Sequence, residues 1–128
     1  HEDISAAPFD AKVTVPVSTL DDLIREHGTP VFCKIDVEGF EDRVLAGLSR
    51  PIPVLSFEAF PLDKSRSARC IQHLMTLGDY RFRTVLAEQF RWVQDDWVDA
   101  QTMLNTVENW NMDMGSGDIY ARVESVVR

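Results

Sequence analysis

An apolar stretch that ends in three closely spaced carboxylates constrains this chain more than any other feature. Residues 31–41 read Val-Phe-Cys-Lys-Ile-Asp-Val-Glu-Gly-Phe-Glu, which predicts a buried strand, a turn and the start of a helix. The helix continues to about residue 48, and a second apolar strand follows at 54–58. A strand, a helix and a strand in this order form a βαβ unit, whose two strands pair in parallel through a right-handed crossover. The sequence therefore predicts an α/β fold.

The remaining segments extend this unit on both sides. Residues 1–12 are mixed and polar, so we interpret them as a loose lead-in and residues 13–128 as a single domain. Periodicity and turn residues predict, in chain order, a short β segment over 13–17, a helix between Ser18 and Gly28, a helix over 65–77, half-exposed strands over 80–85 and 90–93, a helix around 97–107 and a last strand over 119–123. Parallel strands are thus expected first and antiparallel strands last.

The composition excludes several classes of partner. The 128 residues carry a formal net charge of -8 and no basic stripe, whereas nucleic acids and anionic membrane surfaces bind clustered Lys and Arg. No apolar run approaches the roughly 18 residues of a membrane span, and no signal-peptide pattern opens the chain. Cys33 and Cys70 lie in different contexts, which favours two reduced thiols. We therefore expect a cytoplasmic protein with no nucleic-acid or membrane partner.

The carboxylates mark a candidate site at the end of the parallel strands. Asp36 ends the first strand, Glu38 and Gly39 form the turn beyond it, and Glu58 ends the second strand. Open α/β sheets bind ligands outside the carboxyl ends of their strands, so neighbouring strands would bring Asp36, Glu38 and Glu58 into one cleft. Such a cluster can bind an ammonium group or hydroxyls, hold a divalent cation, or act as a general base with a raised pKa.

A purely structural interpretation of the same acids is also open. Asp36 and Glu38 would then cap the helix that starts near Phe40, because acids are favourable at the N-terminus of a helix. Glu41 fits this interpretation well. The residue pattern alone leaves both interpretations standing.

Residues 34–41, Lys-Ile-Asp-Val-Glu-Gly-Phe-Glu, resemble the hallmark segment of the FkbM-type S-adenosylmethionine-dependent methyltransferases. The flanking segments agree in the correct order: 17–23 resembles the helix that precedes this strand in the family, 44–47 the helix that follows it, 53–58 the next strand, and 77–80 the glycine-tyrosine entry to the late strands. The resemblance covers residues 13–85 well and the remainder loosely.

The resemblance implies the C-terminal part of a Rossmann-like methyltransferase sheet. It also implies that a methyl group passes from the cofactor S-adenosylmethionine to a small-molecule acceptor, usually to an oxygen of a small molecule or sugar. It makes Asp36 and Glu58 catalytic residues, sets Asp36, Val37, Glu38 and Gly39 against the cofactor, and implies no metal. Methyl transfer needs aligned reactants and a deprotonated acceptor, so a neutral replacement of Asp36 should cut turnover strongly.

The chain departs from the family pattern in residues 1–30, which contain neither the glycine-rich first loop nor the acid that holds the cofactor ribose. We therefore interpret the chain as the C-terminal half of the domain, from about its third strand onward. Since the cofactor lies across the two halves of the sheet, we expect the isolated chain to be inactive and to bind S-adenosylmethionine weakly or not at all. An exposed apolar sheet edge would also invite a homodimer.

Two other functions are compatible with these residues. A metal-dependent hydrolase or transferase would use Asp36, Glu38 and Glu58 as oxygen ligands for Mg²⁺ or Ca²⁺. A non-catalytic interaction module would use the late half of the fold to pair through its open edge.

Overall fold

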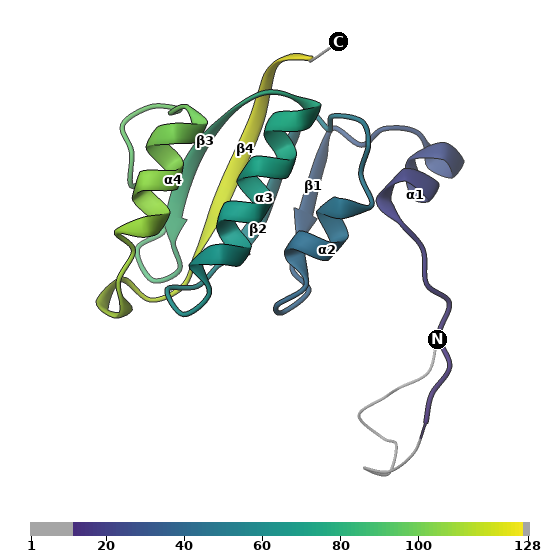
Figure 1. Ribbon diagram of the computed structural model, residues 1–128, viewed down its shortest axis with the longest axis horizontal. Coiled ribbons are helices and arrows are strands. Elements are labelled where there is room, and N and C mark those ends of the chain that lie inside the picture. The colour runs from purple at the N-terminus through teal and green to yellow at the C-terminus, as the bar shows by residue number, and fades with distance from the viewer. Residues whose placement is uncertain (1–11, 127–128) are drawn as a thin grey trace.

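The computed structural model describes residues 12–126 and folds them into one sheet with helices packed on it (Figure 1). Of the predicted lead-in over 1–12, all but Lys12 lies outside the described residues. The elements, in chain order, are α1 Leu20–His27, β1 Phe32–Ile35, α2 Glu41–Ala46, β2 Val54–Ala59, α3 Lys64–Leu77, β3 Gly78–Leu86, α4 Ala100–Glu108, the short 3-10 helix η2 Met112–Met114 and β4 Gly117–Val126. None of the helices in this part of the chain is long and apolar enough to cross a membrane.

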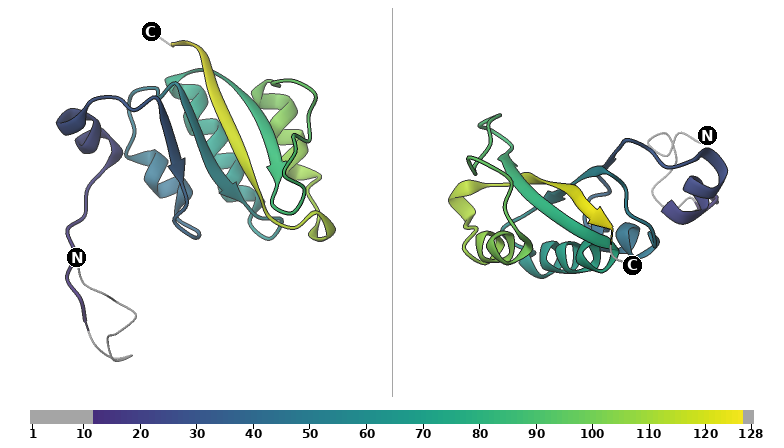
Figure 2. Two further views of the ribbon diagram at one scale, coloured as in Figure 1. Left: turned by 180° about the vertical axis from the view of Figure 1, so that it is seen from behind. Right: turned by 90° about the horizontal axis from the view of Figure 1, so that it is seen from above.

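The sheet has four strands in the order β1-β2-β4-β3. β1 and β2 pair in parallel, as the βαβ pattern predicts, and β4 lies between β2 and β3 and is antiparallel to both. The α/β class, with parallel pairing first and antiparallel pairing last, is confirmed. The helices α2, α3 and α4 lie side by side on one face of the sheet, which Figure 2 shows from above. The carboxyl ends of β1 and β2 therefore meet at one edge of this layer.

The core lies between the sheet and these helices. Side chains alternate along each strand, and the row of Ile35, Phe57 and Ile119 across β1, β2 and β4 is buried. Ile71 and Leu74 of α3 are fully buried in the same core. Each buried side chain of this size contributes about 1.5–3 kcal/mol, so this layer fixes the positions at which β1 and β2 end.

Helix α1 is attached through polar contacts and through Leu20 and Ile24, which pack partly buried against the core. Thr19 caps it by accepting a hydrogen bond from the Asp22 backbone N–H at 3.1 Å. Asp21 joins it to the connection after α2, because its carboxylate accepts a hydrogen bond from the Ser49 N–H at 2.8 Å. No residue of α1 is fully buried, and Leu23 is 44% exposed.

β1 forms an edge of the sheet, and its outer side pairs with no strand within residues 12–126. Val31 and Phe32 at this edge are 85% and 46% exposed. An apolar groove of about 270 Å³ lies between α1 and β1, lined by Leu20, Leu23, Ile24, His27, Gly28, Pro30, Phe32, Cys33 and Ile52. Unpaired apolar edges can pair with another chain, so a homodimer through β1 stays a prediction, which sedimentation velocity at several concentrations would check.

Two predicted β segments are not strands. Residues 13–17 form no strand, because β structure requires a hydrogen-bonded neighbour and this segment has none in the described part of the chain. The strand predicted at 90–93 is also wrong. β3 pairs along its whole length with β4, and Trp92 makes only an isolated bridge to Val85. The Trp92 ring instead packs edge-on against Tyr120, with 5.2 Å between ring centroids.

Candidate active site

The turn between β1 and α2, residues 36–39, presents the predicted acids at the carboxyl end of β1, and we call it the acid turn. Glu38 and Gly39 have left-handed backbone conformations, with φ of 52° and 108°. Glycine adopts such angles easily, whereas a residue with a Cβ pays roughly 1–2 kcal/mol for a left-handed conformation. The strain at Glu38 persists only if contacts outside the turn hold it in place.

The two residues predicted to be catalytic lie together. Carboxylate oxygens of Asp36, Glu58 and Glu41 lie within 4.8 Å of one another. The parallel register of β1 and β2 causes this proximity, because it aligns Ile35 with Phe57 and so places the next residue of each strand at the same level. Asp36 is exposed and Glu58 is half-buried, so a ligand can reach both.

Glu41 has a different role from the one that its place in the sequence suggests. It is fully buried, and its carboxylate accepts hydrogen bonds from the backbone N–H groups of Val37 and Gly39, both at 3.1 Å. The residue that precedes α2, Phe40, makes no side-chain capping bond. Acids near a helix N-terminus can also act through the helix dipole, so the capping interpretation of Asp36 and Glu38 stays a prediction. The Glu41 carboxylate fastens the acid turn from within the core.

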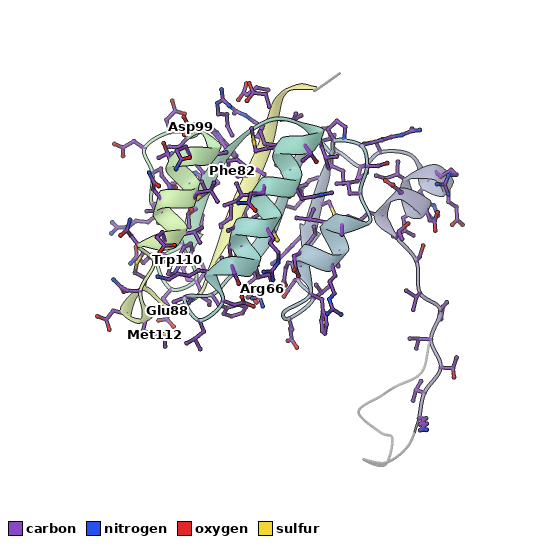
Figure 3. The ribbon with its side chains drawn as sticks, viewed as in Figure 1. Arg66, Phe82, Glu88, Asp99, Trp110 and Met112 are labelled. Carbon is purple, nitrogen blue, oxygen red and sulfur yellow. The ribbon has the colours of Figure 1, made fainter. Side chains whose placement is uncertain are left out.

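Arg66 supports this arrangement from α3, and Figure 3 labels it near the start of that helix. Its side chain is 8% exposed, and its Nη1 donates a hydrogen bond to Asp63 Oδ2 at 2.8 Å. Its Nε lies 3.4 Å from Glu41 Oε1, close enough for an ion pair but without the geometry of a hydrogen bond. Sequence reasoning missed both Glu41 and Arg66, because a buried charge pair leaves no local pattern.

A further acid, Asp118, joins the cluster from β4. It stands directly opposite Glu58 in the β2–β4 ladder, and like charges in that position destabilise a sheet. Burial, and then the charges of Asp36 and Asp118, raise the pKa of Glu58. Burial also raises the pKa of Asp118, against the opposing effect of Lys34 and with a further rise from Asp36. Protonation of this cluster therefore stabilises the folded chain.

This cluster predicts a fall in stability as the pH rises. Between the ordinary carboxyl pKa of about 4 and the raised values of Glu58 and Asp118, the folded state binds more protons than the unfolded state, so the free energy of unfolding falls with rising pH. Urea unfolding from about pH 4.5 to 7 should show this fall, and the double variant Glu58→Gln/Asp118→Asn should show less of it.

Two other acids change the free energy of unfolding in the opposite direction with pH, and they are the same in both proteins compared. Backbone hydrogen bonds from Ser49 and Thr102 lower the pKa of Asp21 and of Asp99, so their contributions are lost as the pH falls below the ordinary carboxyl range. Both acids are present in the variant, so the difference between the two proteins isolates the cluster. Parallel pH profiles for the two proteins would contradict the prediction.

A hollow of about 410 Å³ adjoins the acid turn, lined by Glu38, Gly39, Glu58, Phe60, Leu62, Asp63 and Arg66. It combines carboxylates with an apolar wall, since Phe60 and Leu62 contribute hydrocarbon surface. Sites for small organic ligands have this mixture of an apolar lining and a few polar groups.

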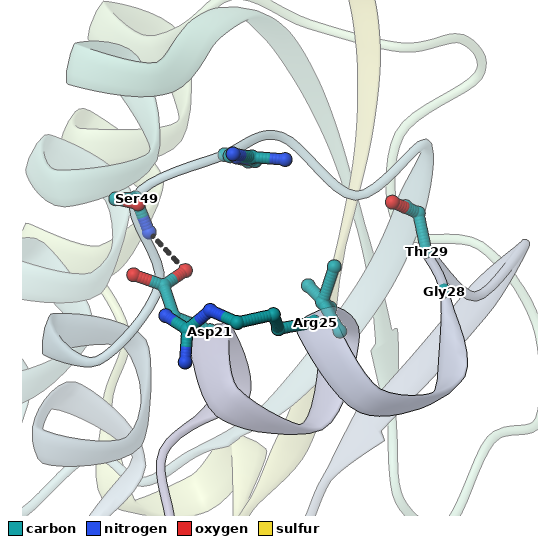
Figure 4. Close-up of a pocket in the computed structure, with 7 residues that line it drawn as sticks. Asp21, Arg25, Gly28, Thr29 and Ser49 are labelled. Carbon is teal, nitrogen blue, oxygen red and sulfur yellow. Dashed lines mark hydrogen bonds between the residues drawn. The ribbon is translucent and has the colours of Figure 1, made fainter.

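A second hollow, of about 360 Å³, lies away from the acids and is shown in Figure 4. It is lined by Asp21, Ile24, Arg25, Gly28, Thr29, Ser49 and Arg50, and none of these is a candidate residue. The Asp21–Ser49 hydrogen bond drawn there holds α1 against the connection after α2. We therefore interpret the residues around this hollow as structural.

Asp36, Glu41 and Glu58 also have the spacing of oxygen ligands for a divalent cation. Glu41, however, already accepts two amide hydrogens and faces the Arg66 guanidinium. A cation bound through Glu41 would compete with these contacts for the same carboxylate.

Comparisons with known proteins place the chain in a family. No curated protein and no solved structure matches it. The family model described as the methyltransferase FkbM domain matches residues 4–111, a span that includes the acid turn, Glu58 and Arg66. The predicted resemblance is thereby confirmed, and the chain belongs to the FkbM methyltransferase family.

Proposed function

We propose that the acid turn, Glu58 and the adjoining hollow form the reactive end of a site that moves a methyl group from S-adenosylmethionine to an oxygen of a small molecule or sugar. Family membership supports methyl transfer. The observation that carries the proposal is the close approach of the Asp36 and Glu58 carboxylates at the carboxyl ends of two parallel strands. Open α/β sheets bind their ligands at this edge.

The residues present fit the reactive end of such a donor. S-adenosylmethionine, when bound, supplies a methyl group on a positively charged sulfur. The carboxylates of Asp36 and Glu38 project from an exposed turn and would stabilise a cation beside them. Val37 and Gly39 donate their N–H groups to Glu41, so they would hold the cofactor through their backbone carbonyl groups.

Glu58 is our candidate for the general base. A base works best when its pKa lies near the working pH, and burial together with the charges of Asp36 and Asp118 raises the pKa of Glu58 in that direction. Its carboxylate would accept the proton of the acceptor hydroxyl as that oxygen forms its bond to the methyl carbon, while the bond from that carbon to sulfur breaks and S-adenosylhomocysteine leaves. Asp36, which is more exposed, would act through its charge on the donor side.

The test is a titration of the labelled chain with S-adenosylmethionine, followed by NMR. We expect weak binding, with a dissociation constant of about 1 mM or higher, because β1 is an edge strand and supplies only one side of the crevice in which such cofactors lie. Amide shifts should be concentrated in residues 36–39. S-adenosylhomocysteine, which lacks the methyl group and the positive charge, should shift these amides less.

Two results would count against these statements. Shifts spread evenly over the sheet, with none concentrated in the acid turn, would remove the proposed site. Tight, stoichiometric binding in calorimetry would instead refute the expectation that this chain offers only part of the cofactor site.

A further inference from the structure

The acid turn contains a strained residue that is held by contacts from α2. Glu38 lies in the left-handed region, which is unfavourable for a residue with a side chain, and Gly39 follows with a positive φ as well. The two N–H groups on either side of Glu38, those of Val37 and Gly39, both donate to the Glu41 carboxylate. Glu41 thus clamps the strained residue from both sides.

Arg66 extends this clamp to the other wall of the hollow. Its guanidinium lies against the Glu41 carboxylate and is hydrogen-bonded to Asp63. The guanidinium carbon also lies 5.4 Å from the centre of the Phe60 ring. Asp63 and Phe60 belong to the connection between β2 and α3, whereas Glu41 fixes the turn after β1. One buried cation therefore joins the two loops that line the hollow.

We propose that Glu41 and Arg66 are positioning residues, which hold the acid turn and the β2–α3 connection in register so that Asp36 and Glu58 face one ligand. The assignment rests on the proposed function only in taking the acid turn as the reactive end. Each charge depends on the other. Glu41 is fully buried and Arg66 nearly so, and removing either partner of a buried pair leaves an uncompensated charge.

Hydrogen exchange of single amides tests the assignment. In Glu41→Gln, one side-chain oxygen remains but the other becomes an NH₂ group, which cannot accept a hydrogen bond. We expect exchange of at least one of the Val37 and Gly39 amides to accelerate by about tenfold or more, because a buried hydrogen bond is lost. Amides in the β2–β4 ladder should keep their protection. Arg66→Met should accelerate the same two amides, whereas Arg66→Lys, which keeps the charge, should restore part of their protection.

Asp42→Asn is the matched control. Asp42 is the neighbour of Glu41 on α2, and it pairs with Arg69 of α3 at 2.9 Å in a more exposed ion pair between the same two helices. This variant should leave the Val37 and Gly39 amides unchanged. If Glu41→Gln proves unstable, the double variant Glu41→Gln/Arg66→Met, which removes both buried charges, should fold and still show fast exchange at the two amides.

Two outcomes would overturn the assignment: unchanged exchange at both amides, or an equal loss of protection across the whole sheet, which would make the pair merely a part of the core. The exchange experiment contains no methyl donor. Its failure is therefore distinguishable from failure of the methyltransferase proposal, which the titration with S-adenosylmethionine decides.

Discussion

In an active enzyme that contains this site, replacing Glu58 by glutamine is expected to lower the rate of methyl transfer by about 10²–10⁴-fold, the range that general acid–base catalysis supplies. Glutamine keeps the size of the side chain, but its amide cannot act as a general base. Glu58 is half-buried, at the end of a core strand, so the fold should survive the change. The ascending limb of the pH–rate profile should disappear with the carboxylate.

The comparison needs a matched carboxylate outside the site. Glu88 is exposed in the turn after β3, the strand at the opposite edge of the sheet from β1, so Glu88→Gln should leave the rate unchanged. Asp36→Asn should also lower turnover strongly, and the ascending limb should remain but move to lower pH, because the charge of Asp36 raises the pKa of Glu58. Near-normal turnover in Glu58→Gln would remove Glu58 from the mechanism, and near-normal turnover in Asp36→Asn would remove Asp36.

Replacing Gly117 by alanine is expected to destabilise the fold by about 3 kcal/mol, the upper end of the usual cost of overpacking. A Cβ on Gly117 would lie 2.6 Å from the Val85 carbonyl oxygen and 2.9 Å from Cζ2 of Trp110. Neither neighbour can move freely. Val85 belongs to the β3–β4 ladder, and Trp110 is 2% exposed with its Nε1 donating to the Gly115 carbonyl at 2.7 Å. The clash is therefore expected to disrupt the pairing of β3 and β4 at the start of β4.

Urea unfolding measures this effect as a lower midpoint at an unchanged slope. Ser116→Ala, one residue earlier and outside the ladder, is the control, and its effect should stay within about 0.5 kcal/mol. A similarly small effect in Gly117→Ala would show that Trp110 can rearrange, contrary to its tight packing in the core.

The βαβ unit could be predicted because its signals are local. An apolar run, a turn with glycine, a helix and a second apolar run all lie within residues 31–58, and only parallel pairing connects them well. The structure of the segments at 13–17 and 90–93 could not be predicted from local signals. Each has a β-like composition, but strand formation depends on a partner, and the partner of β3 is a strand that begins 31 residues after Leu86, at Gly117.

The sequence by itself determined the fold class, the family and the meeting of Asp36 with Glu58, since neighbouring parallel strands must bring their ends together. The tertiary structure alone decided what surrounds those two acids. Asp118 arrives through the register of an antiparallel strand, and Arg66 arrives through the packing of α3 on the sheet. Glu41 looked like an ordinary first-turn acid until its burial beneath the acid turn was visible. Burial and register depend on contacts between residues far apart in the chain, and no local pattern of residues encodes them.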